Sequence, residues 1–156
     1  MSTFFDSNVL VCALDASEGA KHTIADALIA QHISDRSLVI STQVLQETFS
    51  VLTRKKRLPA DQVLDTLDVF RREKVVPADV ASVLRALALC SRHQLSVWDA
   101  LIVQAALDAR CSTLLTEDLQ LGMRFGALEV VNPFELAAHE PATAYAAKAP
   151  APRRKR

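Results

Sequence analysis

The sequence predicts an α/β protein in which a central, mostly parallel sheet is covered by helices on both faces. Two observations lead to this prediction. Short, entirely apolar segments of strand length recur along the chain, and longer segments with helical periodicity separate them. Half of the 156 residues are apolar and 23% are charged, so the chain can bury a core of its own. We therefore expect one globular domain over residues 1–140.

Two strands and two helices are expected in the first third of the chain. The apolar run 3–5 is read as a strand because polar, turn-favouring residues follow it directly. Residues 22–33 place apolar side chains every three or four positions, which predicts a helix. The apolar run 38–40 has the length of a strand. Residues 42–55 carry an apolar stripe along one side, which predicts a second helix packed on the sheet.

The middle of the chain predicts three further helices. Pro59 suits the first position of a helix, where no amide hydrogen bond is needed. A short strand at 75–76 follows, and Asp79 can cap the next helix through its carboxylate. A serine opens another helix over about 97–109, and residues 112–115 form the strand after it.

The C-terminal part of the chain closes the domain and then changes character. Residues 128–131 are the last expected strand, and Asn132 begins a short closing helix. Residues 141–156 contain five basic residues, no acid and no apolar period, so we expect a disordered basic tail. Residues 1–140 contain 13 basic residues against 18 acids, a net charge of −5. Such a body is unlike a DNA-reading domain, whose folded face is basic.

Composition excludes several classes of protein. The three glycines stand too far apart for the phosphate-binding loops of ATPases, GTPases and dinucleotide-binding enzymes. The three cysteines form no C-x-x-C pair, so we expect reduced thiols and neither a zinc knuckle nor a redox pair. The sequence shows no signal-peptide pattern and no apolar segment of membrane-spanning length. We therefore expect a cytoplasmic protein.

Four acidic residues are expected to meet at one edge of the sheet. Asp6 and Asp118 each follow the carboxyl end of a strand, where the sites of α/β proteins form. Asp99 lies in the first turn of a helix that is expected to begin at the same edge. Glu47 lies on the margin of an apolar helical stripe, so it faces the seam between helix and sheet.

Each acid, taken singly, also has an explanation without catalysis. Asp6 could begin a turn, and Glu47 could lie on the helix surface. Asp99 completes a capping box with Ser96, and Asp118 could cap the segment after it. Together they are harder to explain, because two carboxylates about 4 Å apart repel by roughly 4 kcal/mol at an effective dielectric constant near 20. A divalent cation would offset that repulsion, and hard oxygen ligands favour Mg²⁺ or Mn²⁺. A metal in such a site can activate water for phosphodiester hydrolysis.

Four short motifs, in order along the chain, resemble those of the PIN-domain nucleases. They are F-D-S-N-V-L at 5–10, Q-x-x-x-E-x-x-x-x-L at 43–52, W-D-A-L-I-V-Q-A-A at 98–106 and L-L-T-E-D-L at 114–119. The resemblance extends over about residues 2–138. It implies a three-layer α/β/α sandwich with a central parallel sheet.

The resemblance also implies a function and partners. The four acids would line a Mg²⁺ or Mn²⁺ site that cleaves single-stranded RNA, and Ser7, Asn8 and Thr116 match supporting positions. Glu117 beside Asp118 leaves open which acid is the fourth ligand. Within the family, the compact chain is most similar to VapC-type toxins of toxin–antitoxin pairs. That similarity implies a homodimer and a small antitoxin partner.

Other interpretations stay open at this point. The chain could be a PIN-fold RNA-binding or scaffold protein without catalysis, or a PIN nuclease that processes RNA outside a toxin–antitoxin pair. An aspartyl phosphatase is disfavoured because Asn8 stands where a second aspartate would be needed. The basic run 54–57 suits a helix end as well as an RNA contact. Trp98 is interpreted as a core residue, because Leu101 and Ile102 accompany it on its helix.

Overall fold

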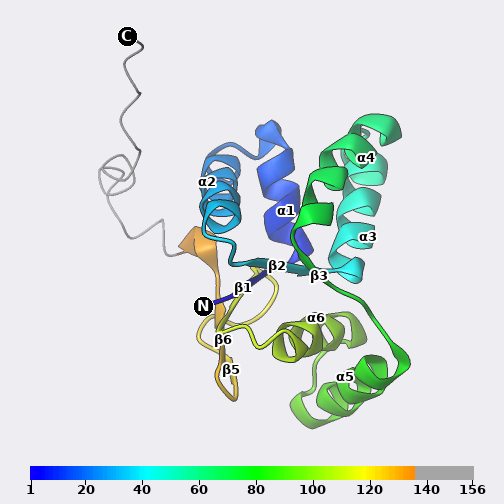
Figure 1. Ribbon diagram of the computed structural model, residues 1–156, viewed down its shortest axis with the longest axis vertical. Coiled ribbons are helices and arrows are strands. Elements are labelled where there is room, and N and C mark those ends of the chain that lie inside the picture. The colour runs from blue at the N-terminus through cyan, green and yellow to red at the C-terminus, as the bar shows by residue number, and fades with distance from the viewer. Residues whose placement is uncertain (136–156) are drawn as a thin grey trace.

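A six-stranded sheet forms the centre of the protein, as the computed structural model shows (Figure 1). The structure describes residues 1–135; the expected domain boundary at residue 140 and the expected tail over 141–156 lie outside the described residues. The strand order is β3-β2-β1-β4-β6-β5, and every neighbouring pair is parallel except β5 with β6. The expected mostly parallel sheet is therefore confirmed.

The strands are short, as the apolar runs predicted. They are β1 (Thr3–Phe5), β2 (Leu38–Ser41), β3 (Lys74–Val76), β4 (Thr113–Leu115), β5 (Arg124–Phe125) and β6 (Leu128–Val131). Only β5 is absent from the sequence prediction, because two residues carry no alternation to detect. It pairs back on β6 through a turn in which Gly126 adopts a φ of 61°, a value that glycine accepts readily.

Helices cover both faces of this sheet, which gives the three layers expected (Figure 1). One face carries the helices α1 (Ser7–Leu14), α2 (Ala20–Ser34), α3 (Thr42–Ser50) and α4 (Ala60–Asp68). The other face carries α5 (Val80–His93) and α6 (Val97–Asp108). Short 3-10 turns follow α1 and α4, and a π-helical turn over Val51–Lys55 extends α3. After β6, Pro133–Glu135 are helical, which agrees with the expected start of a closing helix.

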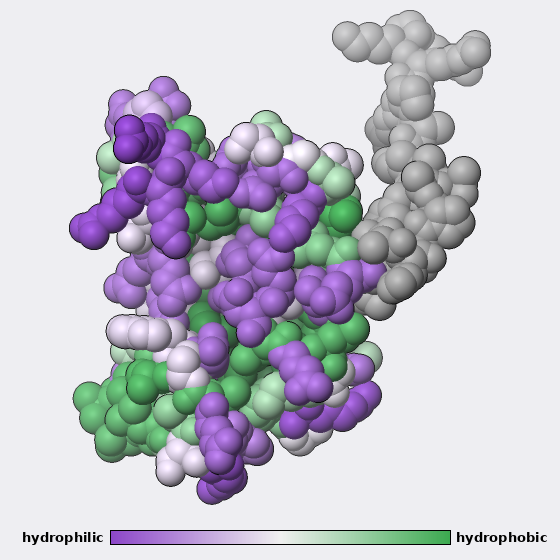
Figure 2. Space-filling view, turned by 180° about the vertical axis from the view of Figure 1, so that it is seen from behind, coloured by the Kyte–Doolittle hydropathy of each residue, from purple (hydrophilic) through white to green (hydrophobic). Residues whose placement is uncertain are grey.

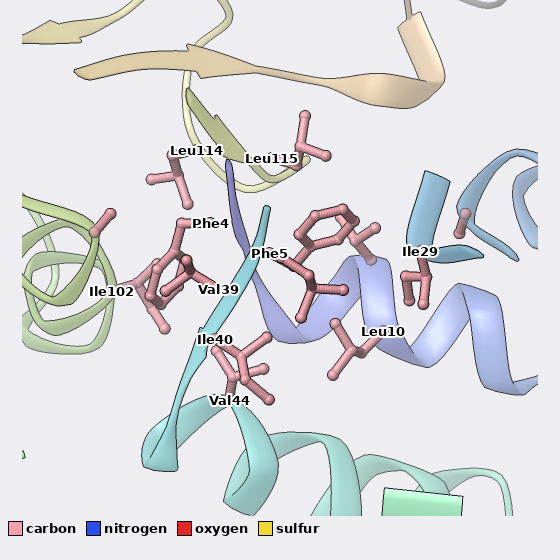
Figure 3. Close-up of a cluster of buried hydrophobic side chains, with 14 of the residues drawn as sticks. Phe4, Phe5, Leu10, Ile29, Val39, Ile40, Val44, Ile102, Leu114 and Leu115 are labelled. Atoms are coloured by element: carbon pink, nitrogen blue, oxygen red, sulfur yellow. The ribbon is translucent and has the colours of Figure 1, made fainter. Parts of the chain in front are cut away.

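The core explains why the strands are apolar throughout. Phe4 is the register partner of both Val39 and Leu114, so these three side chains share one face of the sheet. They point toward Ile102 of α6, whereas Phe5 points to the opposite face, toward α1 and α2 (Figure 3). Both phenylalanines are fully buried. Successive residues of a strand face opposite sides, so a sheet covered twice needs apolar residues at each position.

Helix α1 is absent from the sequence prediction. Six of its eight residues are buried, among them Val9, Leu10 and Val11. A helix that is buried on most sides has no polar face, so its apolar residues show no helical period. Asp6, expected just beyond the strand, caps this helix by accepting a hydrogen bond from the Ser7 amide.

The expectation that Trp98 packs in the core is wrong, because its side chain is 67% exposed. Helix α6 buries the face that carries Ala100, Val103 and Ala106, and Trp98 falls outside that face. It belongs to a set of exposed apolar residues that we call the α5–α6 apolar surface: Val80, Leu84, Leu87, Val97 and Trp98. Figure 2 shows hydrophobic side chains gathered at the end of the molecule that these helices form. None of the helices in residues 1–135 is long and apolar enough to cross a membrane.

Candidate active site

The candidate site lies where the strand order reverses. The chain runs outward from β1 through β2 to β3, and then returns to the other side of β1 with β4. The carboxyl ends of β1 and β4 therefore lie at the switch point of the sheet, the place where open α/β sheets bind ligands. Asp6 directly follows β1, and Thr116, Glu117 and Asp118 directly follow β4.

Asp6 is the buried centre of this site. Its side chain is 5% exposed, and one oxygen accepts hydrogen bonds of 2.7 Å from the Ser7 amide and 3.4 Å from the Ser7 hydroxyl. The other oxygen accepts a hydrogen bond of 2.7 Å from the Thr116 hydroxyl. Neighbours from two strand ends thus fix both carboxylate oxygens.

Asn8 joins Asp6 to Asp118. Its side-chain amide donates to Thr116 Oγ1 and to Asp118 Oδ2, each at 3.0 Å, and reaches Asp6 Oδ2 at 3.4 Å. The Asp118 amide also donates to Thr116 Oγ1, at 3.1 Å. The two acids expected at the strand ends therefore meet through one shared amide and one shared hydroxyl.

Glu47 approaches from helix α3 on the opposite side of Asp6. The Ser7 hydroxyl donates a 2.7 Å hydrogen bond to Glu47 Oε2. Gln43, one helical turn earlier, donates at 2.6 Å to Glu47 Oε1 and at 3.2 Å to the carbonyl oxygen of Trp98. Glu47 is half-buried, as its place on the margin of the apolar stripe predicted.

Among the described residues, the Asp99 side chain shares no hydrogen bond with the network of Asp6, Glu47 and Asp118. Its carboxylate accepts a 2.7 Å hydrogen bond from the Ser96 hydroxyl, which in turn accepts one from the Asp99 amide. Gln43 bonds to the carbonyl of the residue before it, which places Asp99 at the margin of the site. Within residues 1–135, no three acidic, histidine or cysteine side chains are gathered tightly enough to form a metal-binding group.

The electrostatics of the site centre on Asp6. Burial raises the pKa of its carboxyl from 3.8 to about 6, against the opposing hydrogen bonds from Thr116 and Ser7. The negative charges of Glu47 and Asp118 raise it further. The ionised form of Asp6 is therefore costly in the metal-free protein, and a nearby cation would stabilise it.

The chemistry of the donor atoms suits a hard divalent cation, although the acids are not gathered into a metal-binding group in the described residues. Asp6, Glu47 and Asp118 offer carboxylate oxygens, and the side-chain oxygen of Asn8 is buried without a donor among the described residues. Oxygen ligands of this kind suit Mg²⁺ or Mn²⁺ better than zinc.

Glu117 and Asp118 face different ways. Lys21 of α2 forms a 2.6 Å ion pair with Glu117 Oε2, whereas Asp118 bonds to Asn8. The hydrogen bond to Glu117 raises the pKa of the Lys21 ammonium above its ordinary value. The geometry thus distinguishes the two neighbouring acids that the sequence left unresolved.

Two contacts of this network were not part of the sequence prediction. Gln43 opens the motif at 43–52, but no contact was assigned to it; it stands four positions before Glu47, and that spacing on a helix could have suggested one. Lys21 is separated from Glu117 by 96 residues, and no spacing rule links them.

The chain belongs to the PIN-domain family, which matches it over residues 3–122. No curated protein matches the chain.

Several solved structures share the fold. VapC20 of Mycobacterium tuberculosis, described as a sarcin-ricin loop cleaving toxin, is 21% identical, with a TM-score of 0.63 over 72% of this chain and 87% of that one. A toxin–antitoxin complex from Klebsiella pneumoniae is 22% identical, with a TM-score of 0.61 over 85% and 98% of the two chains. VapBC2 from Rickettsia felis, bound to a DNA fragment from its promoter, is 18% identical, with a TM-score of 0.61 over 83% and 97%.

Proposed function

We propose that the protein is a Mg²⁺- or Mn²⁺-dependent endoribonuclease that hydrolyses single-stranded RNA, and that it acts as the toxin of a toxin–antitoxin pair. The observation that supports this most is the buried Asp6, joined through Ser7 and Asn8 to Glu47 and Asp118 at the switch point of a PIN-domain fold.

In this proposal the chain holds and orients the reacting groups. Asp6, Glu47 and Asp118 would hold the cation, and Asp99 would complete the site from α6. A bound Mg²⁺ or Mn²⁺ would supply Lewis acidity, lowering the pKa of the attacking water and neutralising charge on the phosphate.

The hydroxyls of the site keep the acids in place. Ser7 donates to Glu47 and Thr116 donates to Asp6, so each hydroxyl fixes one carboxylate oxygen. We expect water to attack phosphorus as the bond to the 3′-oxygen breaks, which leaves a 5′-phosphate and a 3′-hydroxyl and forms no 2′,3′-cyclic phosphate.

The direct test is cleavage of a labelled single-stranded RNA with Mg²⁺, Mn²⁺ or EDTA. We expect cleavage only with metal, and we expect Asp6→Asn to abolish it. Asp26→Asn, an exposed aspartate of α2, is the matched control and should remain active. Full activity in EDTA, or a 2′,3′-cyclic phosphate product, would contradict the proposal. A stem-loop substrate belongs in the same assay, because VapC20 is described as a sarcin-ricin loop cleaving toxin.

The proposed role as a toxin draws support from neighbours that were solved as toxin–antitoxin complexes. We expect expression of the chain to arrest growth of the host, and co-expression of a small protein from the adjoining reading frame to restore it. Both the RNA and such an antitoxin would be met in the cytoplasm, where we place the activity. A nuclease that processes RNA outside a toxin–antitoxin pair would also cleave RNA. Its expression, however, would cause no growth arrest that the adjacent gene could relieve.

The proposed homodimer would form through the α5–α6 apolar surface. Val80, Leu84 and Leu87 follow one another at helical spacing on α5, and their side chains are 77%, 61% and 43% exposed. The same helix has Asp79 at its start and Arg92 near its end. An antiparallel pair of α5 helices would therefore bring opposite charges together at both ends of the apolar contact.

One alternative has an observation in its favour. The bond between Asp99 and Ser96 gives Asp99 a structural role in starting α6, as a PIN-fold binding or scaffold protein without catalysis would allow. Cleavage that depends on Asp99 would exclude this alternative.

A further inference from the structure

Lys21 connects helix α2 to the segment that carries Asp118. Its ammonium lies 2.6 Å from Glu117 Oε2 and 5.2 Å from the centre of the Phe134 ring. Glu117 belongs to the connection after β4, and Phe134 follows β6. One side chain thus contacts two segments that leave neighbouring strands of the sheet.

The three residues after β4 point to three different partners. Thr116 donates to Asp6, Glu117 pairs with Lys21, and Asp118 accepts from Asn8. Neighbouring residues share one backbone, so a fixed Glu117 limits the directions that Asp118 can take. The ion pair is therefore part of what holds Asp118 toward Asp6.

The same ion pair keeps a further carboxylate away from the acids. Glu117 is the neighbour of Asp118 and, without its partner, would be a competing oxygen ligand. Lys21 is 44% exposed and Glu117 28%, and ion pairs this exposed contribute little to folding stability. Loss of the pair should consequently change the site more than the fold.

We propose that Lys21 is a positioning residue, which engages Glu117 so that Asp118 is the acid presented to the metal. The proposal rests on the metal-dependent function above. It concerns the identity of the ligand and requires no contact between Lys21 and RNA.

Mn²⁺ affinity, measured by titration calorimetry, tests the role of Lys21 without RNA. In the unaltered background, Glu117→Gln should change the Mn²⁺ Kd by less than about twofold. Asp118→Asn should weaken Mn²⁺ binding at least tenfold, as is typical when a group that supports a metal is lost. In a Lys21→Met background, Glu117→Gln should weaken Mn²⁺ binding about tenfold, because the freed Glu117 carboxylate would then hold the cation in place of Asp118, which is no longer positioned. Lys21→Arg keeps the charge and should restore the unaltered pattern.

The control is Arg124→Met, which removes a similar cation from the Arg124–Glu129 ion pair in the β5–β6 hairpin. It should leave the effect of Glu117→Gln unchanged. An equal effect of Glu117→Gln in the Lys21 and Lys21→Met backgrounds would overturn the positioning role while leaving the metal site intact. No Mn²⁺ binding by the unaltered protein would overturn the metal-dependent function as well. If Lys21→Met fails to fold, the two single variants still test the proposal. Equal losses of Mn²⁺ affinity in Glu117→Gln and Asp118→Asn would contradict the assignment of Asp118 as the acid presented to the metal.

Discussion

At the scale of single residues, Asp6 combines burial with two acidic neighbours. Its pKa of about 6 lies above the ordinary 3.8, so the folded protein holds the protonated form more tightly than the unfolded chain does. This preference for the protonated form stabilises the folded, metal-free protein. The stabilisation is fully present below pH 3.8 and is lost as the pH rises through 6. A shift of this size corresponds to about 3 kcal/mol.

We expect Asp6→Asn to remove this dependence on pH. In EDTA, the stability of the variant relative to the parent should rise between pH 4 and pH 7 by up to about 3 kcal/mol. Denaturant unfolding at several pH values measures the difference directly. Added Mn²⁺ should reverse the order at neutral pH, since only the parent gains a ligand. If the free energy of unfolding varied with pH in the same way for both proteins, the ionisation of Asp6 would not destabilise the folded state.

For Asp99, the geometry is compatible with two roles: capping of helix α6 and participation in the proposed metal site. We expect Asp99→Asn to abolish RNA cleavage and to cost no more than about 1 kcal/mol of stability, since the Ser96 hydroxyl still caps the helix. Cleavage assays beside thermal melts separate the two effects. Asp108→Asn, at the far end of the same helix, is the control and should stay active. An active Asp99→Asn protein would restrict Asp99 to helix capping.

The sequence placed three of the four acids well. Asp6 and Asp118 follow parallel strands, and Glu47 lies on the margin of an apolar stripe, so strand order and helical period suffice to bring them together. The Asp99 side chain is held by a local hydrogen bond from Ser96. The spacing of the two residues suggests this bond, but it does not show whether Asp99 caps the helix or serves the site. The Lys21 contact depends on the packing of α2 and carries no local signal.

At the scale of elements, prediction succeeded where an apolar run marked a strand buried on both faces, or where apolar residues recurred along a helix. The strands β1 to β4 and β6 and the helices α2 to α6 were predicted in this way. Helix α1 is buried nearly all round and β5 has two residues, so neither leaves a period to detect. Trp98 was misplaced because the buried face of α6 is formed by Ala100, Val103 and Ala106, on another side of the helix.

The α5–α6 apolar surface gives a prediction at this scale. Leu84→Glu should convert a dimer to a monomer, because a charge would lie in the centre of the apolar contact. Leu64→Glu on α4 is a matched control, since its side chain is 58% exposed against 61% for Leu84. Sedimentation velocity or light scattering gives the mass of each protein. A dimeric Leu84→Glu protein, or a monomeric parent, would contradict the proposed interface.

At the scale of the whole molecule, charge is divided unequally along the chain. Residues 1–140 carry 13 basic residues against 18 acids, and residues 141–156 carry five basic residues and no acid. A body of net −5 repels RNA at long range, so the C-terminal charges should favour the encounter.

We expect deletion of 141–156 to weaken RNA binding at low salt and to have little effect at high salt, because counterion release weakens as salt rises. The cleavage rate at saturating RNA should stay the same. Binding and single-turnover cleavage at several salt concentrations test both statements. A truncated protein without cleavage at saturating RNA would place these residues in the active site and move the domain boundary beyond residue 140.

The two edges of the sheet limit how another chain can attach. One edge is β3, three residues long, with the exposed Lys74 at its start and Pro77 directly after it. The other is the two-residue β5, which begins with the exposed Arg124. Short, charged edges and a following proline discourage a foreign strand from extending the sheet. Within residues 1–135, recognition of a peptide by side chains is therefore favoured over strand addition, and the same edges disfavour growth of the folded protein into fibrils.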